Sequence, residues 1–249
     1  MKRNRSTPPA IAAARARREL ARSGTPRRAA GTAAYFRTYE GLKFLGVDSA
    51  TIRRLAASVH ANAGADWDLD AARSFAAALV ARPELEAKLL GIVVLGRFRR
   101  QFDRSLLIDA RTWLERWCHD WATTDGLCSE VIGPLLVARP ELRRVLRGWR
   151  RSRHLYVRRA SAVGLINLAR TGRELDEAYS AALALAAEDH HLMHKAVGWL
   201  LREAGKTDPP RLERFLRRHG RRLSRTSVRY AIERFPAGKR ATLLKLTRP

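Results

Sequence analysis

The chain has few cysteines and no long apolar run. Only Cys118 and Cys128 occur in 249 residues, and no CxxC motif is present. Two thiols cannot supply a disulfide framework, so we expect buried thiols in a reducing, cytoplasmic compartment. No apolar run approaches the roughly 18 residues that a membrane span needs, and no signal-peptide core is visible. We therefore expect no membrane anchor.

Acidic residues are also scarce, and this scarcity points to a polyanionic partner. Aspartate and glutamate total 24 against 49 lysines and arginines, which gives a net charge of +25. Such an excess repels itself unless a polyanion neutralises it. Nucleic acid is the leading candidate, and an anionic membrane surface competes with it. The content of 46% hydrophobic residues is ordinary for a globular protein.

The strand-like alternation of apolar and polar residues is missing, so we predict an all-α fold. From about residue 66, alanine, leucine and arginine recur at helical spacing between turn signals such as TDG and TDPP. Residues 33–59 predict two helices joined by a short GVDS turn. Residues 1–30, with Glu19 as their one acid, predict a basic arm, partly helical or flexible, that contacts DNA or packs. Residues 31–249 then form the main domain.

An internal echo refines this prediction to a solenoid. The segments AKLLGIVVL, RASAVGLINL and KAVGWLLRE each begin at or next to a basic residue. With Lys88, Arg159 and Lys195 in register, Asp125 falls between the first two, at a period of about 36 residues. Two helices per period favour an α-solenoid of HEAT-like repeats, in which equivalent residues line one curved surface. We therefore predict that these four residues lie in a row along a concave basic groove.

Asp125 is the one acid in that predicted row, and the sequence allows two interpretations of it. In one continuous helix, Trp113, Trp117, Trp121 and Asp125 share a face. Alternatively, the tryptophans are core residues and Asp125 caps a new helix, because TTDG precedes an apolar run. A carboxylate facing DNA costs affinity through repulsion, so an acid in the groove indicates a task other than binding.

Two further basic stretches predict contacts with DNA phosphates. Residues 139–159 hold nine arginines against one acid, and a run of one sign repels itself, which favours DNA contact over a solvated face. From this stretch we select Arg150, Arg151 and Arg153. Residues 211–235 are similarly basic and predict the last helices, with Ser224 as an N-cap.

Three clustered histidines do not predict a metal site. His190, His191 and His194 lie close together, and two histidines four apart can share a helix face. No third ligand set and no HExxH motif accompanies them. We expect these side chains to cap a helix, pack or touch phosphate, and we expect no bound metal.

Several ordered segments resemble a known family. WATTDGLCSEVIGPLL, YVRRASAVGLINLARTG, HHLMHKAVGWLLREAGK and LSRTSVRYAIERFP resemble, in that order, the AlkD-like DNA alkylation repair family of HEAT-like-repeat DNA glycosylases. AAYFRTYEGLKFLGV resembles its amino-terminal region, so the resemblance spans residues 33 to about 236. After LGV, where relatives often carry proline, this chain has Asp48, Ser49 and Ala50, which we expect to alter only a turn.

The resemblance implies roles for particular residues. By motif match, Asp125 is similar to the catalytic aspartate, and Trp121 and Trp199 are similar to its tryptophan partners. Arg159 is similar to the groove arginine, with Arg158 beside it as the alternative.

The resemblance also implies an activity. The implied activity is that of a monofunctional DNA glycosylase, which would hydrolyse the N-glycosidic bond of cationic N3- or N7-alkylated purines in duplex DNA, without base flipping or a lyase lysine. No metal or small-molecule cofactor is implied, and we expect a monomer near a prokaryote-like nucleoid. A non-catalytic HEAT-repeat binder of damaged or branched DNA is the alternative. A protein-binding scaffold is third, because a charge of +25 disfavours it.

Overall fold

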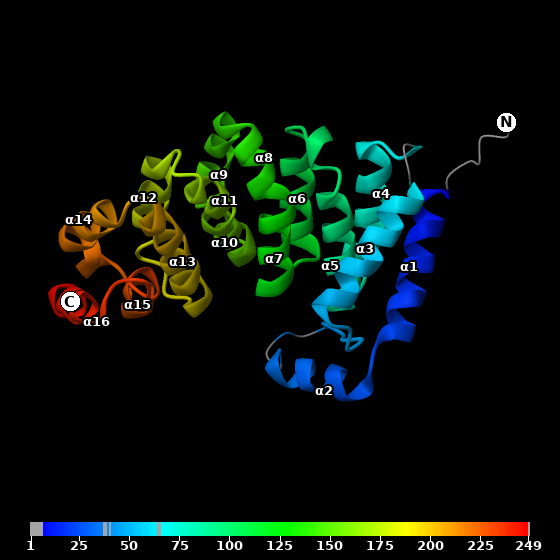
Figure 1. Cartoon of the computed structure of the whole chain (residues 1–249), viewed down its shortest axis with the longest axis horizontal. Helices are drawn as coiled ribbons and strands as arrows, with labels where there is room; N and C mark the ends of the chain where they lie inside the picture. Colours follow the sequence, from blue (N-terminus) through cyan, green and yellow to red (C-terminus); the bar gives the residue numbers. More distant parts are fainter. Residues whose placement is uncertain (1–6, 37–38, 40, 64–65, 249) are drawn as a thin grey trace. The chain divides into compact units, whose positions relative to one another are not determined.

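The computed structural model describes residues 7–36, 39, 41–63 and 66–248. Within these residues the chain is helical and contains no β-strand, only an isolated bridge between Lys43 and Glu84. The predicted all-α class is confirmed (Figure 1). The chain divides into two compact units, residues 1–131 and 132–249, and each is described by itself.

The first unit consists of helix pairs joined by short turns. Its helices are α1 (Pro9–Ser23), α2 (Pro26–Tyr35), α3 (Ser49–Ala63), α4 (Leu69–Val80), α5 (Leu85–Gly96), the 3-10 turn η2 (Arg99–Gln101), α6 (Leu106–Arg116) and α7 (Trp121–Leu127). Helix α5 packs against α3, α4 and α7, and is buried over most of its length. It is therefore the central helix of this unit.

The predicted basic arm is helical where the structure describes it. Helix α1 packs on α4 and α3, and it buries Ala13, Ala16 and Leu20. Arg17 of α1 forms an ion pair with Glu84 at 2.5 Å. Residues 9–23 are thus docked on the first unit, while residues 1–6 of the arm lie outside the described residues. The division of function at residue 30 stays a prediction.

The helix expected before the GVDS turn is shorter than predicted. Helix α2 ends at Tyr35, and the described residues from Gly41 to Asp48 are not helical. Gly41 and Gly46 have φ values of 74° and 75°, a left-handed conformation that ends regular helix. Residues 41–48 form an irregular segment, which we call the strap. Its apolar spacing reflects the packing of these residues and not a helix.

A buried acid holds this strap in place. The Glu86 carboxylate, 3% exposed, accepts hydrogen bonds from the backbone N–H groups of Leu45, Gly46 and Val47 at 2.8 to 3.3 Å. The departure at Asp48 has a local role as expected, because its carboxylate accepts the N–H of Thr51 in the first turn of α3. This hydrogen bond is the main reason that the pKa of Asp48 lies below its ordinary value.

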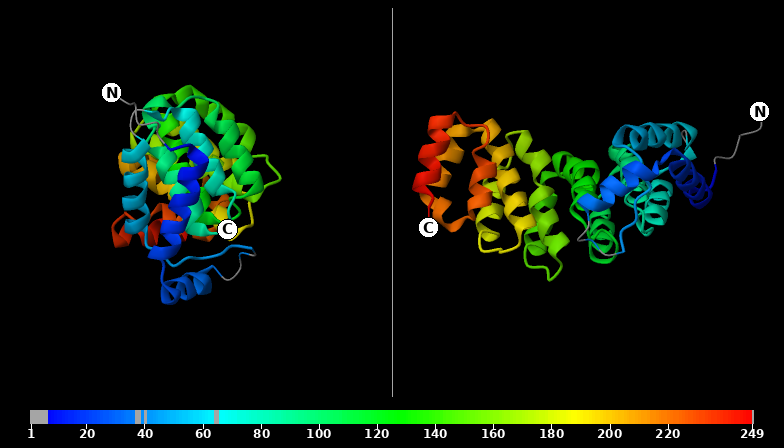
Figure 2. Two further views of the ribbon diagram at one scale, coloured as in Figure 1. Left: turned by 90° about the vertical axis from the view of Figure 1, so that its right-hand side faces the viewer. Right: turned by 90° about the horizontal axis from the view of Figure 1, so that it is seen from below.

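The second unit continues the pattern of helix pairs. It contains α8 (Gly133–Ala138), the 3-10 turn η4 (Pro140–Leu142), α9 (Arg143–Trp149), α10 (Leu155–Val163), α11 (Ile166–Arg170), α12 (Leu175–Ala184), α13 (His191–Thr207), α14 (Pro209–His219), the 3-10 turn η5 (Gly220–Arg222), α15 (Arg225–Ala231) and α16 (Ala237–Leu246). A π-helical turn, Cys128–Ile132, precedes α8 in the chain. Helix α13 lies between α12 and α15 and is the centre of this unit (Figure 2).

Close helix packing explains the glycine of KAVGW. A Cβ atom at Gly198 would lie 2.5 Å from Cβ of Tyr230 and 2.7 Å from the carbonyl oxygen of Ser227. Helices α13 and α15 can approach this closely only with glycine at that point. Ser224 accepts the N–H of Ser227 at the start of α15, which confirms the predicted cap.

Two other expectations concern the interior and the membrane. Cys118 and Cys128 are both buried thiols, and burial raises the pKa of Cys118 to about 12. Among the described residues, none of the helices is both long and apolar enough to cross a bilayer.

We predict that Glu86→Gln destabilises the protein by about 1 to 3 kcal/mol, because one amide oxygen cannot accept from three buried N–H groups. Chemical denaturation would measure the change in unfolding free energy. Glu19→Gln, at an exposed position of α1, is the control and should stay within about 0.5 kcal/mol of wild type. Equal stability of the two variants would show that the strap does not depend on Glu86.

Candidate active site

The N-cap of α7 is Asp120, and not Asp125, which one of the two interpretations of the sequence had offered as a cap. Asp120 is 2% exposed, and its carboxylate accepts the backbone N–H of Thr123 at 2.8 Å and the hydroxyl of Thr123 at 2.6 Å. The hydroxyl of Thr124 donates to the carbonyl of Asp120 at 2.8 Å. Burial raises the pKa of the Asp120 carboxyl above its ordinary value. The structure therefore assigns the N-cap to Asp120, and Asp125 lies inside the helix.

Because α7 begins at Trp121, the four residues that would share a face in one continuous helix fall into two groups. Helix α6 ends at Arg116, so Trp113 and Trp117 precede the break, and Trp113 is buried in the core. Trp121 and Asp125 remain one helical turn apart on the half-exposed face of α7. Of the four-residue stripe, only this pair shares a face.

Aromatic side chains surround Trp121. Its indole stacks on Phe36 with ring centroids 5.2 Å apart and an interplanar angle of 9°. Tyr35 meets the same indole edge to face at 6.0 Å and is 73% exposed. An exposed tyrosine beside the candidate pair is a functional candidate that we did not select from the sequence. The adjacent YF pair was its only signal, and that pair is equally typical of a core.

Asp125 lines a cavity of about 220 Å³ in the first unit. Residues of α3, α5 and α7 form its walls, including Arg53, Ile92 and Val93. Glu130 lines the same cavity, so Asp125 is not the lone acid that we predicted for this surface. Glu130 forms an ion pair with the guanidinium of Arg53 at 3.4 Å.

Lys88 has a role different from the predicted DNA contact. It is 5% exposed, and its ammonium donates to the carbonyl oxygens of Val80 and Trp117, both at 2.8 Å. These carbonyls end α4 and α6, whose last C=O groups have no partner within their own helix. Burial lowers the pKa of this ammonium. Lys88 thus fixes the turn from which α7 starts, and we do not retain it as a DNA ligand.

The second unit holds the remaining members of the predicted row. One guanidinium nitrogen of Arg159, which is buried, donates to the carbonyl of Leu192 in the first turn of α13. Lys195 is exposed on α13, and Trp199, one turn later, is half-buried. The structure therefore places Lys195 and Trp199 on one helix face, as the spacing predicted, and uses Arg159 to hold the start of that helix.

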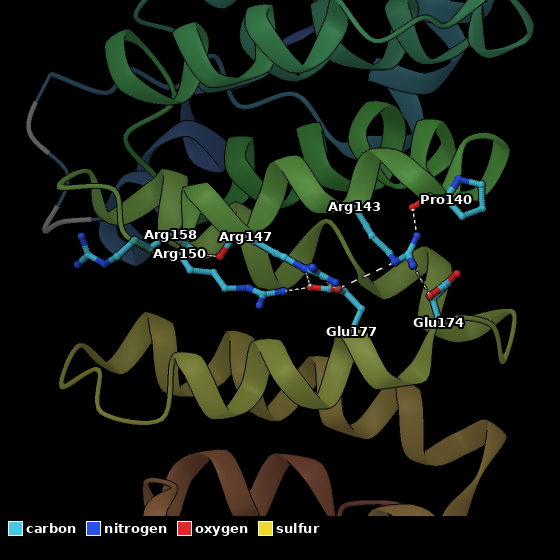
Figure 3. A network of polar contacts seen from close by, with 8 residues as sticks. Pro140, Arg143, Arg147, Arg150, Arg158, Glu174 and Glu177 are labelled. Atoms are coloured by element: carbon cyan, nitrogen blue, oxygen red, sulfur yellow. Dashed lines mark hydrogen bonds and ion pairs between the residues drawn. The ribbon is translucent and has the colours of Figure 1, made fainter.

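Internal ion pairs engage much of the arginine-rich segment. Arg147 of α9 and Arg150, the residue that follows α9, bind the buried carboxylate of Glu177 on α12, with Arg143 near it (Figure 3). Burial raises the pKa of the Glu177 carboxyl, but the hydrogen bonds from Arg147 and Arg150 lower it more. The pKa of Glu177 therefore lies below its ordinary value. Arg150 is therefore a structural residue instead of the predicted phosphate ligand.

The other arginines of this segment divide into two groups. Arg158 pairs with Glu188 at 2.7 Å and donates to two backbone carbonyls. This internal bonding explains Arg158 without a phosphate. Arg151 and Arg153 are exposed in the turn before α10 and stay available for DNA.

The histidines cap and pack. His190 accepts the N–H of Leu192 through Nδ1 at 3.1 Å and so caps α13, as one of our expectations had it. Its ring stacks on His191, and His194 bonds to the carbonyl of Glu188. Within the described residues, no three His, Cys, Asp or Glu side chains form a group that could hold a metal ion.

Comparison of the chain with known proteins identifies its family. The family model described as DNA alkylation repair enzyme matches residues 16–235. The chain belongs to the DNA alkylation repair family. No curated protein matches the sequence.

A solved structure supports the fold of this family member. It is a predicted DNA alkylation repair enzyme from Enterococcus faecalis, with a TM-score of 0.76 and 16% sequence identity. The similarity covers 86% of this chain and 98% of that one. The family match starts inside α1 and ends before α16.

We predict that Lys88→Met lowers the unfolding free energy by about 1 to 3 kcal/mol, because two buried carbonyls lose their donor. Lys195→Met is the matched control, since Lys195 is the exposed residue at the equivalent repeat position, and it should change stability by less than about 0.5 kcal/mol. Thermal or chemical denaturation would measure both. A neutral effect of Lys88→Met would contradict the role of Lys88 in fixing the start of α7.

Proposed function

We propose that this member of the DNA alkylation repair family is a monofunctional DNA glycosylase that releases cationic N3- or N7-alkylated purines from duplex DNA. The observation that carries the proposal is the position of Asp125. A carboxylate that is not needed as a cap lies one turn after an indole, at the wall of a cavity, in a protein with a charge of +25.

The chemistry suits a carboxylate. When the C1′–N bond of an alkylpurine breaks, its electron pair neutralises the cationic base and leaves positive charge on the sugar. Asp125 stabilises this oxocarbenium-like sugar and orients the water whose oxygen bonds to C1′, as carboxylates do in glycoside hydrolysis. The water proton passes to the carboxylate or to solvent, and the products are a neutral free base and an abasic site.

Indoles suit the other end of the bond. The face of a tryptophan attracts a cation by about 0.5 to 2 kcal/mol. Trp121, whose indole stacks on Phe36, contacts the lesion nucleotide from α7. For Trp199, in the second unit, we keep the role of a tryptophan partner that the family resemblance implies. Recognition by charge and stacking requires no pocket for a flipped base, in agreement with the mechanism that the family resemblance implies.

The exposed cations of the second unit hold the backbone of the duplex. Lys195, Arg151 and Arg153 are exposed, and phosphate contacts of this kind give affinity without sequence preference. Arg159 acts mainly as a positioning residue for α13 through Leu192. The enzyme acts as a monomer, without a metal or organic cofactor, in the compartment that holds the chromosome.

A non-catalytic binder of damaged or branched DNA is the second candidate. The abundance of basic surface favours it as much as it favours an enzyme. Asp125 separates the two functions, because an acid in a DNA-facing cavity weakens binding and helps only a reaction.

We predict that Asp125→Asn lowers single-turnover release of 7-methylguanine from duplex DNA by about 100-fold or more, the usual cost of losing one charge-stabilising group. DNA affinity should stay equal or rise, because the variant removes a negative charge. Release of the labelled base and fluorescence anisotropy would measure the two quantities.

Glu130→Gln is the matched control, since it makes the same change at the same cavity. The Glu130 carboxylate is paired with Arg53. The variant should therefore release 7-methylguanine at a rate within about tenfold of wild type. A larger loss for Glu130→Gln than for Asp125→Asn would assign the reaction to Glu130. No release by the wild-type protein, with DNA binding intact, would favour the binder.

We predict that lesion charge decides the rate. The wild-type protein should release 7-methylguanine and leave an uncharged damaged base such as uracil in the same duplex. Trp121→Leu should slow release of the cationic base by roughly 2- to 30-fold, which is the rate equivalent of one cation–π contact. Equal release of charged and uncharged bases by the wild-type protein would refute recognition by charge.

A further inference from the structure

A group of exposed cations lies where the turn of η5 packs beside the end of α16. We call it the C-terminal cationic cluster, and its members are Arg218, Arg221, Arg222, Arg225, Lys245 and Arg248, all exposed. Two contacts fix the junction, because Arg221 donates to the carbonyl of Leu246 and Arg225 donates to the carbonyl of Leu244. The turn of η5 therefore lies beside the last turn of α16, in the second unit.

Helix capping accounts for only part of this cluster. The last carbonyl groups of α16 need donors, and Arg221 and Arg225 supply them. Arg218, Arg222, Lys245 and Arg248 have no side-chain partner among the described residues. Four unpaired cations in one place cost free energy by mutual repulsion unless an anion neutralises them.

The nearest acids along the chain are committed to other cations. Glu213 binds Arg217 and Lys239, and Glu233 binds Arg202. Burial lowers the pKa of His219, and the neighbouring charges of Arg218 and Arg222 lower this pKa further. The cluster thus has an uncompensated positive potential.

The residue types favour phosphate as the anion. All six side chains are exposed, and five of the six belong to arginines, whose planar guanidinium matches phosphate oxygens. An anionic membrane would also require apolar side chains that insert. Leu246, 42% exposed, is the one large apolar side chain exposed on the described part of α14 to α16. A protein partner would require aromatic anchors, and none is exposed there.

We propose that the C-terminal cationic cluster binds the phosphate backbone of duplex DNA as a second contact surface, separate from the residues of the candidate active site. Lys245 and Arg248 belong to the segment beyond the family match, which ends at residue 235. The other four residues of the cluster lie inside that match. It contributes affinity for any duplex, damaged or not, and takes no part in base release.

The test compares two triple variants of the full-length protein that lose the same charge. Arg218→Gln/Arg222→Gln/Lys245→Gln removes the cluster. Arg82→Gln/Arg104→Gln/Arg116→Gln removes three exposed arginines of the first unit and is the matched control. Affinity for an undamaged duplex is measured from about 50 to 200 mM NaCl, the range in which phosphate contacts are most evident.

The cluster variant should show a slope of log K against log salt that is shallower by about 2.7, because each phosphate contact contributes about 0.9. The control should keep the wild-type slope, and release of 7-methylguanine at saturating DNA should be equal for both variants and wild type. Thermal unfolding monitored by circular dichroism verifies the fold. If the triple variant is unstable, Arg222→Gln/Lys245→Gln should still shift the slope by about 1.8.

Equal slopes for the two triple variants would overturn the proposal. So would a cluster variant that keeps the wild-type slope but no longer sediments with phosphatidylserine vesicles, since the partner would then be a membrane. Because the DNA is undamaged, a protein that shows no glycosylase activity can still pass or fail this test.

Discussion

The candidate site depends on the N-cap of α7. A helix that continued from α6 would turn Asp125 and three tryptophans into one stripe, and a cap at Asp125 would use the carboxylate for structure. The buried carboxylate of Asp120 excludes both arrangements, because it binds Thr123 and starts the helix at Trp121. Lys88 reinforces this start by bonding to the carbonyl of Trp117. Asp125 and Trp121 are thereby left together on the open face, with Phe36 supporting the indole.

Buried ion pairs and charged hydrogen bonds also decide which of the many cations meet DNA. Glu177 forms ion pairs with Arg147 and Arg150, and Glu188 forms one with Arg158. Lys88 donates hydrogen bonds to carbonyl groups at two helix ends. A buried charge must be paired or hydrogen-bonded, so these groups hold helices together. The charge available to a polyanion comes from exposed residues such as Lys195 and Arg151 and from the end of the second unit. A net charge of +25 therefore favours a polyanionic partner but does not locate the surface that binds it.

Periodicity predicted the helical class, the pairing of helices and the helix face that joins Lys195 to Trp199, since each follows from local spacing. Capping chemistry predicted Ser224 correctly. The same rules offered Asp125 as a possible cap and did not identify Asp120, because both precede apolar residues and only tertiary burial distinguishes them. Burial also explains the misassigned Lys88 and Arg150, whose partners are distant in the sequence. The strap before α3 was missed because its positive-φ glycines and its acceptor, Glu86, override an apolar spacing typical of helix.

We propose that two aspartates five residues apart have separate tasks, one structural and one chemical. The most direct test measures unfolding free energy and single-turnover release of 7-methylguanine for Asp120→Ala and Asp125→Ala. Loss of the cap should cost about 1 to 2 kcal/mol of stability and leave the release rate of the folded protein within about tenfold of wild type. Asp125→Ala should keep wild-type stability and lose about 100-fold or more of the rate. A rate for Asp125→Ala that falls only as far as its folded fraction falls would contradict the account and make Asp125 a structural residue.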